Sequence, residues 1–151
     1  IFWRSRGSAD NLSRTLERRE RGMDYLVVIG ASLIGYMFGA IWYGAFGRLW
    51  QEAVGLNAED VKPANSVGAY ICALIANIII AGMMRHIFAT SGVYGLWLGA
   101  VSGLGLGLFI AGSYLMLNYT FAKRPVSLRL IDIGHAAGSA TVMGAFLGAM
   151  L

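Results

Sequence analysis

Charged residues are scarce in this chain of 151 residues. They make up 13% of the sequence, whereas a soluble domain averages about 25%, and six of the twelve lysines and arginines precede residue 22. Hydrophobic residues account for 57%, and the mean hydropathy is +0.61. This composition excludes an ordinary soluble domain and predicts an integral membrane protein. The isoelectric point of about 9.5 then reflects flanks and loops, and we expect no nucleic-acid partner.

Cysteine and proline are nearly absent as well. Because Cys72 is the only cysteine, the chain cannot form an internal disulfide framework or a paired-cysteine metal or redox motif. We expect its thiol to be buried, as most free thiols are. The chain contains two prolines and 21 glycines, a composition typical of closely packed transmembrane helices. We expect neither a bound metal ion nor a cofactor.

Four long apolar segments are present, at about 25–46, 67–89, 93–119 and 128–151. A helix of about 20 apolar residues crosses a bilayer core about 30 Å thick. We therefore predict an all-α, integral membrane four-helix bundle with short loops, comprising residues 23–151.

The fourth segment carries charge near its start. Only sixteen uncharged residues follow His135, which is about 24 Å of helix. To cross the bilayer this helix must also include residues 131–135, so Asp132 and His135 are expected at or just inside one interface. Arg129 is spaced to pair with Asp132 at i,i+3, and a helix N-terminus favours the anion.

The connection between the first two spans predicts a short helix lying on the membrane surface. Within residues 47–66, Leu49 and Trp50 fall on one side, and Arg48 and Glu52 on the other. Aromatic residues near span ends are typical of the belts that lie at lipid headgroups. We expect such interface anchors at Trp42, Tyr43, Trp50 and Trp97.

The first 22 residues are polar and basic and lack an initiating methionine. They are either a native cytoplasmic arm or upstream sequence joined to a protein that starts at Met23. The choice sets the orientation, because cytoplasmic loops carry the excess of lysine and arginine. With the arm, its side holds seven basic residues against five; from Met23 the count is one against five and the orientation reverses. We favour Met23 as the start, which places the two basic loops in the cytoplasm.

Glycine recurs every four residues in three of the four spans. The third span holds three overlapping G-x-x-x-G units on one helical face. Small residues at this spacing let helices approach closely where lipid supplies no hydrophobic drive. They predict packing within the bundle, self-association, or both, at Gly35, Gly39, Gly95, Gly99, Gly103, Gly107, Gly134, Gly138, Gly144 and Gly148.

Asp132, His135 and Ser139 share one face of the fourth helix, at i, i+3 and i+7. Two interpretations stay open. Such a stripe suits a proton relay or ion site; alternatively, Asp132 pairs with Arg129 while His135 and Ser139 hydrogen-bond a neighbouring helix. Asn77, in the middle of the second span, is expected to hydrogen-bond another helix. We expect no catalytic residues, because three groups on one straight helix rarely converge on a substrate.

Several stretches together resemble one known family. They are GAIWYGAFGRLWQEAVGL after the first span, Asn77 with Ala81 in the second, GLWLGAVSGLGLG in the third, and NYTFAKRPVSLRLIDIGHAAGSATVMGAFLG over the fourth. Over about residues 23–151 the chain is similar to small bacterial membrane proteins known as domain of unknown function 1761. Family members often follow the Trp-Tyr pair with Ser-Pro, whereas Trp42-Tyr43 here runs into GAFGRLW. The resemblance implies a four-helix protein of the bacterial cell envelope and supplies no catalytic residues.

The sequence supports two functional hypotheses for a multi-pass protein of the bacterial inner membrane. The first is an accessory or scaffold protein, not an enzyme, that packs through its glycine-rich faces against copies of itself or a membrane partner. The second is a proton-coupled or small-solute transporter with Asp132, His135 and Asn77 lining its path. A functional need for an ionisable Asp132 favours transport, and tolerance of Asp132→Asn favours the scaffold.

Overall fold

The structure, a computed structural model, describes residues 4–56 and 67–151. Four helices are long and apolar enough to cross a membrane, and the third of them is built from three consecutive segments without a break. The prediction of an all-α protein with four spans is confirmed. In chain order the segments are α1 (Arg4–Val54), α2 (Val67–Ser91), α3 (Leu96–Gly105), the π-helical η2 (Leu106–Gly112), α4 (Ser113–Phe121) and α5 (Val126–Met150).

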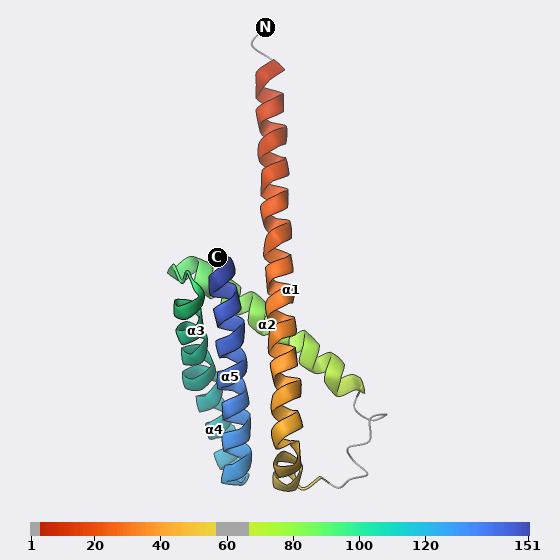
Figure 1. The fold of residues 1–151 in the computed structure, drawn as a ribbon, viewed down its shortest axis with the longest axis vertical. Helices are drawn as coiled ribbons and strands as arrows, with labels where there is room; N and C mark the ends of the chain where they lie inside the picture. The colour runs from red at the N-terminus through yellow and green to blue at the C-terminus, as the bar shows by residue number, and fades with distance from the viewer. Residues whose placement is uncertain (1–3, 57–66) are drawn as a thin grey trace.

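Helix α1 is much longer than the predicted first span. It runs for 51 residues, and its N-terminal part extends beyond the rest of the bundle (Figure 1). At its other end the expected short surface helix is not separate, because residues 47–54 continue α1. No proline interrupts this stretch, and a single glycine within a helix costs only about 1 kcal/mol. The helix stops where Gly55 adopts a φ of +83°; residues 57–66 of the expected surface segment lie outside the described residues.

Helix α5 lies at the centre of the bundle. It packs against α3 and η2 on one side and against α1 on the other (Figure 1). In its most apolar stretch 44% of the residues are buried, compared with 11% in α2. A helix that is covered on two sides can hold polar side chains away from lipid, so α5 is the part of the bundle best suited to carry a site.

Helix α2 crosses the other helices obliquely and packs with only half of its length (Figure 1). Its C-terminal half buries Ala81, Met84 and Phe88 in the apolar core with Met143 and Leu147. Its N-terminal half diverges from the bundle, and between residues 67 and 80 only the side chains of two residues are partly covered. This divergence leaves space between α2 and its neighbours.

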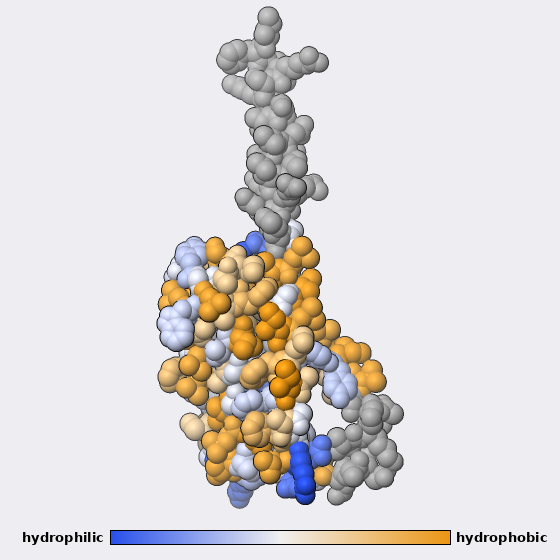
Figure 2. Space-filling model, viewed as in Figure 1, coloured by the Kyte–Doolittle hydropathy of each residue, from blue (hydrophilic) through white to orange (hydrophobic). Residues whose placement is uncertain are grey.

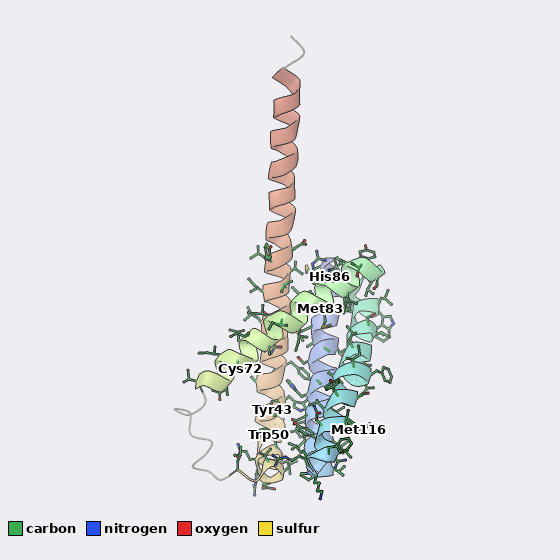
Figure 3. All side chains as sticks on the ribbon, turned by 180° about the vertical axis from the view of Figure 1, so that it is seen from behind. Tyr43, Trp50, Cys72, Met83, His86 and Met116 are labelled. Carbon is green, nitrogen blue, oxygen red and sulfur yellow. The ribbon has the colours of Figure 1, made fainter. Side chains whose placement is uncertain are left out.

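The expectation of a buried thiol is wrong, because Cys72 is exposed on the diverging part of α2 (Figure 3). Its surroundings on the outer face of a spanning helix are lipid, which is itself apolar. A weakly polar thiol therefore needs no cover from the protein there.

The outer surface of the bundle is strongly apolar. Figure 2 shows hydrophobic side chains over most of the visible face, with hydrophilic groups gathered near the ends of the spans. A soluble monomer rarely exposes apolar patches of this extent. The protein is therefore a multi-pass membrane protein that contacts the lipid bilayer, and its outward-facing residues include Ile71, Ile79, Trp97, Phe109 and Tyr114.

Candidate functional site

Helices α3 and α5 touch backbone to backbone. A Cβ atom on Gly103 would collide with the carbonyl of Ala140, and one on Gly99 with the carbonyl of Gly144. Small residues allow helices to meet this closely, and at these two positions only glycine fits. Six of the predicted packing glycines meet here: Gly95, Gly99, Gly103 and Gly107 on one side, and Gly144 and Gly148 of α5 on the other. The backbone N–H of Gly95 donates a hydrogen bond of 2.6 Å to the carbonyl of Gly148.

The glycines between α1 and α5 have a different surrounding, because they face side chains. The ring of Trp42 lies over Gly134, and the ring of Phe38 lies over Gly138. On the facing helix, a Cβ on Gly39 would stand 2.9 Å from Nε2 of His135. A Cβ on Gly35 would stand 2.6 Å from Oδ1 of Asn77. These glycines therefore make room for rings and polar atoms rather than for another backbone.

Asp132 is bound by three aromatic side chains from two other helices. Its side chain is 7% exposed. Oδ1 accepts hydrogen bonds from the Tyr43 hydroxyl at 2.8 Å and the Trp50 indole at 3.0 Å, and Oδ2 accepts one from the Tyr119 hydroxyl at 2.7 Å. Tyr43 and Trp50 come from the end of α1 that lies beside α5 (Figure 3). The carboxylate thus ties α1, α4 and α5 together.

Arg129 does not pair with Asp132, contrary to the i,i+3 prediction. Its guanidinium donates to the backbone carbonyl of Arg124 at 2.8 Å and to the hydroxyl of Thr120 at 3.2 Å. The carboxylate points inward between helices, whereas the guanidinium turns to the loop before α5. Arg129 therefore stabilises the turn between α4 and α5.

Three of the four predicted interface anchors form hydrogen bonds toward α5 rather than outward. The Trp42 indole donates to the carbonyl of Ile131 at 3.0 Å, and Tyr43 and Trp50 bind Asp132. Only Trp97 faces outward, with 77% of its surface exposed. The uninterrupted α1 turns Trp42, Tyr43 and Trp50 onto one side of the helix, at i, i+1 and i+8, which α5 then covers.

His135 lies one turn from Asp132 toward the middle of α5. Its ring packs beside those of Tyr43, with centroids 4.9 Å apart, and Phe38, at 6.2 Å. Within the described residues the imidazole makes no hydrogen bond to a neighbouring helix, nor does the hydroxyl of Ser139. Asn77 also departs from the prediction, since its amide donates to the carbonyl of Ala73 within α2 at 2.8 Å. Its Oδ1 is thus left to face α1.

Two cavities meet at His135 and Asn77. The smaller, of about 180 Å³, lies between α1 and α2 and is bordered by Tyr36, Tyr43 and Tyr70. The larger, of about 320 Å³, lies between α2, η2 and α5 and is bordered mainly by apolar residues, five of them alanines, and by Ser139. Both are mainly apolar and share a few polar groups, as small-molecule sites do. They occupy the space that the divergence of α2 leaves open.

The wall formed by η2 is unusual in its geometry. Leu106, Gly107 and Ala111 of this π-helical segment border the larger cavity. Such segments are rare in proteins and often occur at functional sites. The π-helical segment therefore borders the same cavity as His135 and Asn77.

Among residues 4–56 and 67–151, no group of His, Cys, Asp and Glu could hold a metal ion.

Sequence reasoning did not find all of the residues involved. It did not connect Tyr119 with Asp132, nor Phe38 with His135, and it did not predict the ion pair between Asp24 of α1 and Arg85 of α2. These partners are separated by 13 to 97 residues in the chain, and no local spacing pairs them. The signal that the sequence offers for these residues is that polar side chains, such as Tyr119 and Asp24, lie near the ends of spans.

The helices, the apolar surface and the buried polar groups define an all-α multi-pass membrane protein. Comparison with protein families agrees, because the family described as "Protein of unknown function (DUF1761)" matches residues 26–148. The chain belongs to this family, as the resemblance of its motifs indicated. No curated protein and no solved structure matches the chain significantly.

Proposed function

We propose that this is an accessory membrane protein that binds a small, uncharged molecule within the bilayer. The observation that carries the proposal is the convergence of His135 and Asn77, from two helices, where two cavities adjoin. Gly35 and Gly39 of a third helix leave room for the two polar atoms. Both side chains are half-buried and border apolar cavities, where polar partners are few, so a ligand that hydrogen-bonds to this pair is favoured.

The glycine-rich faces support ligand binding better than scaffolding. The faces on α3 and α5 are occupied by each other, and those on α1 and α5 accommodate side chains of the same chain. Self-association through these faces would require the bundle to open. We therefore place the accessory role in the cavities, with a homo-oligomer or a membrane partner formed through other surfaces.

We also propose that the role is not catalytic and that the protein resides in the bacterial inner membrane. Both oxygens of the Asp132 carboxylate already accept hydrogen bonds. This arrangement holds helices together and leaves the group poorly placed as a general base, which needs a lone pair directed at its substrate. The membrane assignment rests on the family resemblance to bacterial proteins.

Mass spectrometry of co-purified molecules tests the proposal. The protein is purified from bacterial membranes in lipid nanodiscs, and the molecules released on denaturation are compared between the wild type, Gly39→Ala and Gly44→Ala. Gly44 lies on the same helix, and a Cβ there meets nothing within 4 Å. We expect one non-phospholipid compound to be retained by the wild type and Gly44→Ala and lost from Gly39→Ala. Identical profiles for all three would reject ligand binding.

Transport is the second candidate, and one observation favours it. A series of contacts leads from one end of α5 toward the cavities. The Tyr43 hydroxyl donates a hydrogen bond to Asp132, and the Tyr43 ring packs beside that of His135. Proton flux into liposomes under an imposed pH gradient tests this candidate. Flux above that of protein-free liposomes, abolished by both Asp132→Asn and His135→Gln, would favour transport. Flux equal to that of protein-free liposomes would rule out proton-coupled transport.

A further inference from the structure

We infer that the ligand carries an aromatic ring with a hydroxyl or carbonyl oxygen and a short apolar tail, and no net charge. The inference rests on the proposed function, since it names the chemical class that the two adjoining cavities accept. It depends on three features of the site: aromatic walls on one side, a neutral polar pair in the middle, and small apolar walls on the other side.

The aromatic walls belong to the smaller cavity. Tyr36, Tyr43 and Tyr70 border it, from α1 and α2. The hydroxyl of Tyr43 is bonded to Asp132, which fixes the ring beside the cavity and directs the polar end away from it. Aromatic rings attract one another in offset or edge-to-face arrangements beyond what the area that they bury provides. This side therefore favours a ring over an aliphatic group of equal size.

The polar pair stands at the junction of the two cavities. Asn77 already donates to Ala73, so its Oδ1 can accept a hydrogen bond, and the imidazole of His135 can donate or accept one. A phenolic hydroxyl satisfies both partners, and a carbonyl satisfies the imidazole. Among the described residues, no Asp, Glu, Lys or Arg borders either cavity. A charged ligand would lose its hydration without gaining a counter-ion, so an uncharged one is favoured.

The small apolar walls belong to the larger cavity. Five of its thirteen bordering residues are alanines and one is Gly107 of η2, while the larger apolar residues are Ile80, Met84, Leu106 and Met143. Short side chains leave width for a hydrocarbon chain, which makes van der Waals contacts with the apolar wall. Ala73, Asn77 and His135 border both cavities. A molecule that extends past these shared residues would place its ring on the tyrosine side and its tail on the alanine side.

Three matched probes test this class. They are 4-propylphenol, 1-methyl-4-propylbenzene, which lacks the oxygen, and 4-propylcyclohexanol, which lacks the aromatic ring. Binding to the protein in nanodiscs is measured by titration calorimetry, with the heat of empty nanodiscs subtracted. We expect the Kd of 4-propylphenol to be about tenfold lower than that of either other probe, because each lacks either the hydrogen bond or the ring contact, and tenfold corresponds to about 1.4 kcal/mol. Equal affinity for the phenol and one of the other probes would overturn that part of the inference.

Variants identify the site. His135→Leu should weaken 4-propylphenol about tenfold and leave 1-methyl-4-propylbenzene unchanged, because only the phenol uses the imidazole. Gly39→Ala should weaken both probes, and Gly44→Ala neither. Circular dichroism and gel filtration confirm that each variant is folded. If no probe binds, the aromatic class is overturned, while the co-purified compound still decides separately whether the protein binds a ligand.

Discussion

The two sides of α5 use the same spacing of small residues for different purposes. Toward α3, Gly144 and Gly148 admit another backbone, and nothing but main chain and alanine fits between the helices. Toward α1, Gly134 and Gly138 admit the rings of Trp42 and Phe38. The first contact is dry and close, and the second supports hydrogen bonds and cavities. A G-x-x-x-G pattern therefore indicates that another part of the protein lies close to the helix, but not whether that part is a backbone or a side chain.

The largest effect is expected at the backbone contact, from Gly103→Ala. The new methyl group would overlap the carbonyl of Ala140, and backbone must shift to admit it. We expect a loss of about 3 kcal/mol or more in the free energy of unfolding, measured by denaturation in detergent. Gly105→Ala is the control, since a Cβ there meets nothing within 4 Å. Equal stability of the two variants would show that α3 and α5 are not in backbone contact.

Removing the buried carboxylate should have the next largest effect. Asp132→Ala leaves three aromatic donors without an acceptor. Since each unsatisfied buried donor costs about 1–3 kcal/mol and some relax toward other acceptors, we expect a loss of about 2–3 kcal/mol. Glu52→Ala serves as control, because this carboxylate forms an exposed i,i+4 pair with Arg48 worth less than about 0.5 kcal/mol. A wild-type melting curve for Asp132→Ala would contradict the role of the carboxylate as a link between helices.

A smaller effect is expected when a single donor is removed. Tyr119→Phe deletes the hydrogen bond from α4 to Oδ2 of Asp132 and should cost about 1.5 kcal/mol. Trp50→Phe should cost less through hydrogen bonding, because Tyr43 also donates to the same Oδ1 atom. Tyr114→Phe, on the exposed side of α4, should leave stability unchanged. The same thermal unfolding assay applies, and an effect of Tyr114→Phe as large as that of Tyr119→Phe would argue against the Asp132 contact.

The smallest effect on stability is expected between α1 and α5, where Gly39 faces His135 beside the cavities. Gly39→Ala displaces only the imidazole of His135, a side chain that can move, and gains up to about 1 kcal/mol of helix propensity. Its free energy of unfolding should stay within about 1 kcal/mol of the wild type while ligand binding is lost. A collapse of stability equal to that of Gly103→Ala would mean that the two faces of α5 do not differ.

Much of the fold follows from patterns within single segments. Long apolar runs and the bilayer thickness predicted four spans, and the observed helices begin and end within a few residues of the predicted bounds for the last three. The first helix is longer than the predicted span, because residues 47–54 continue α1 and no proline interrupts them although their composition turns polar. Continuation of α1 then carried Trp50 to Asp132, which a separate surface helix would not have done.

The candidate site was predictable only in part. Asp132, His135 and Asn77 could be singled out because polar groups in apolar spans are costly and need a reason. Their partners could not be identified, because spacing along one helix shows only which side chains share a face. Arg129 illustrates the difference: the i,i+3 spacing allowed a pair with Asp132, but the donors from α1 and α4 occupy the carboxylate, and the guanidinium binds the preceding turn.

The sequence by itself determined that this protein lies in a membrane, crosses it with four helices and keeps its glycines where helices approach. Those properties depend on hydropathy and helical period, which are local. Tertiary structure alone decided that α5 is central, that α2 diverges and leaves two cavities, and that His135 and Asn77 meet there. Contacts between helices depend on crossing angles and on side chains far apart in the chain, and no single segment contains that information.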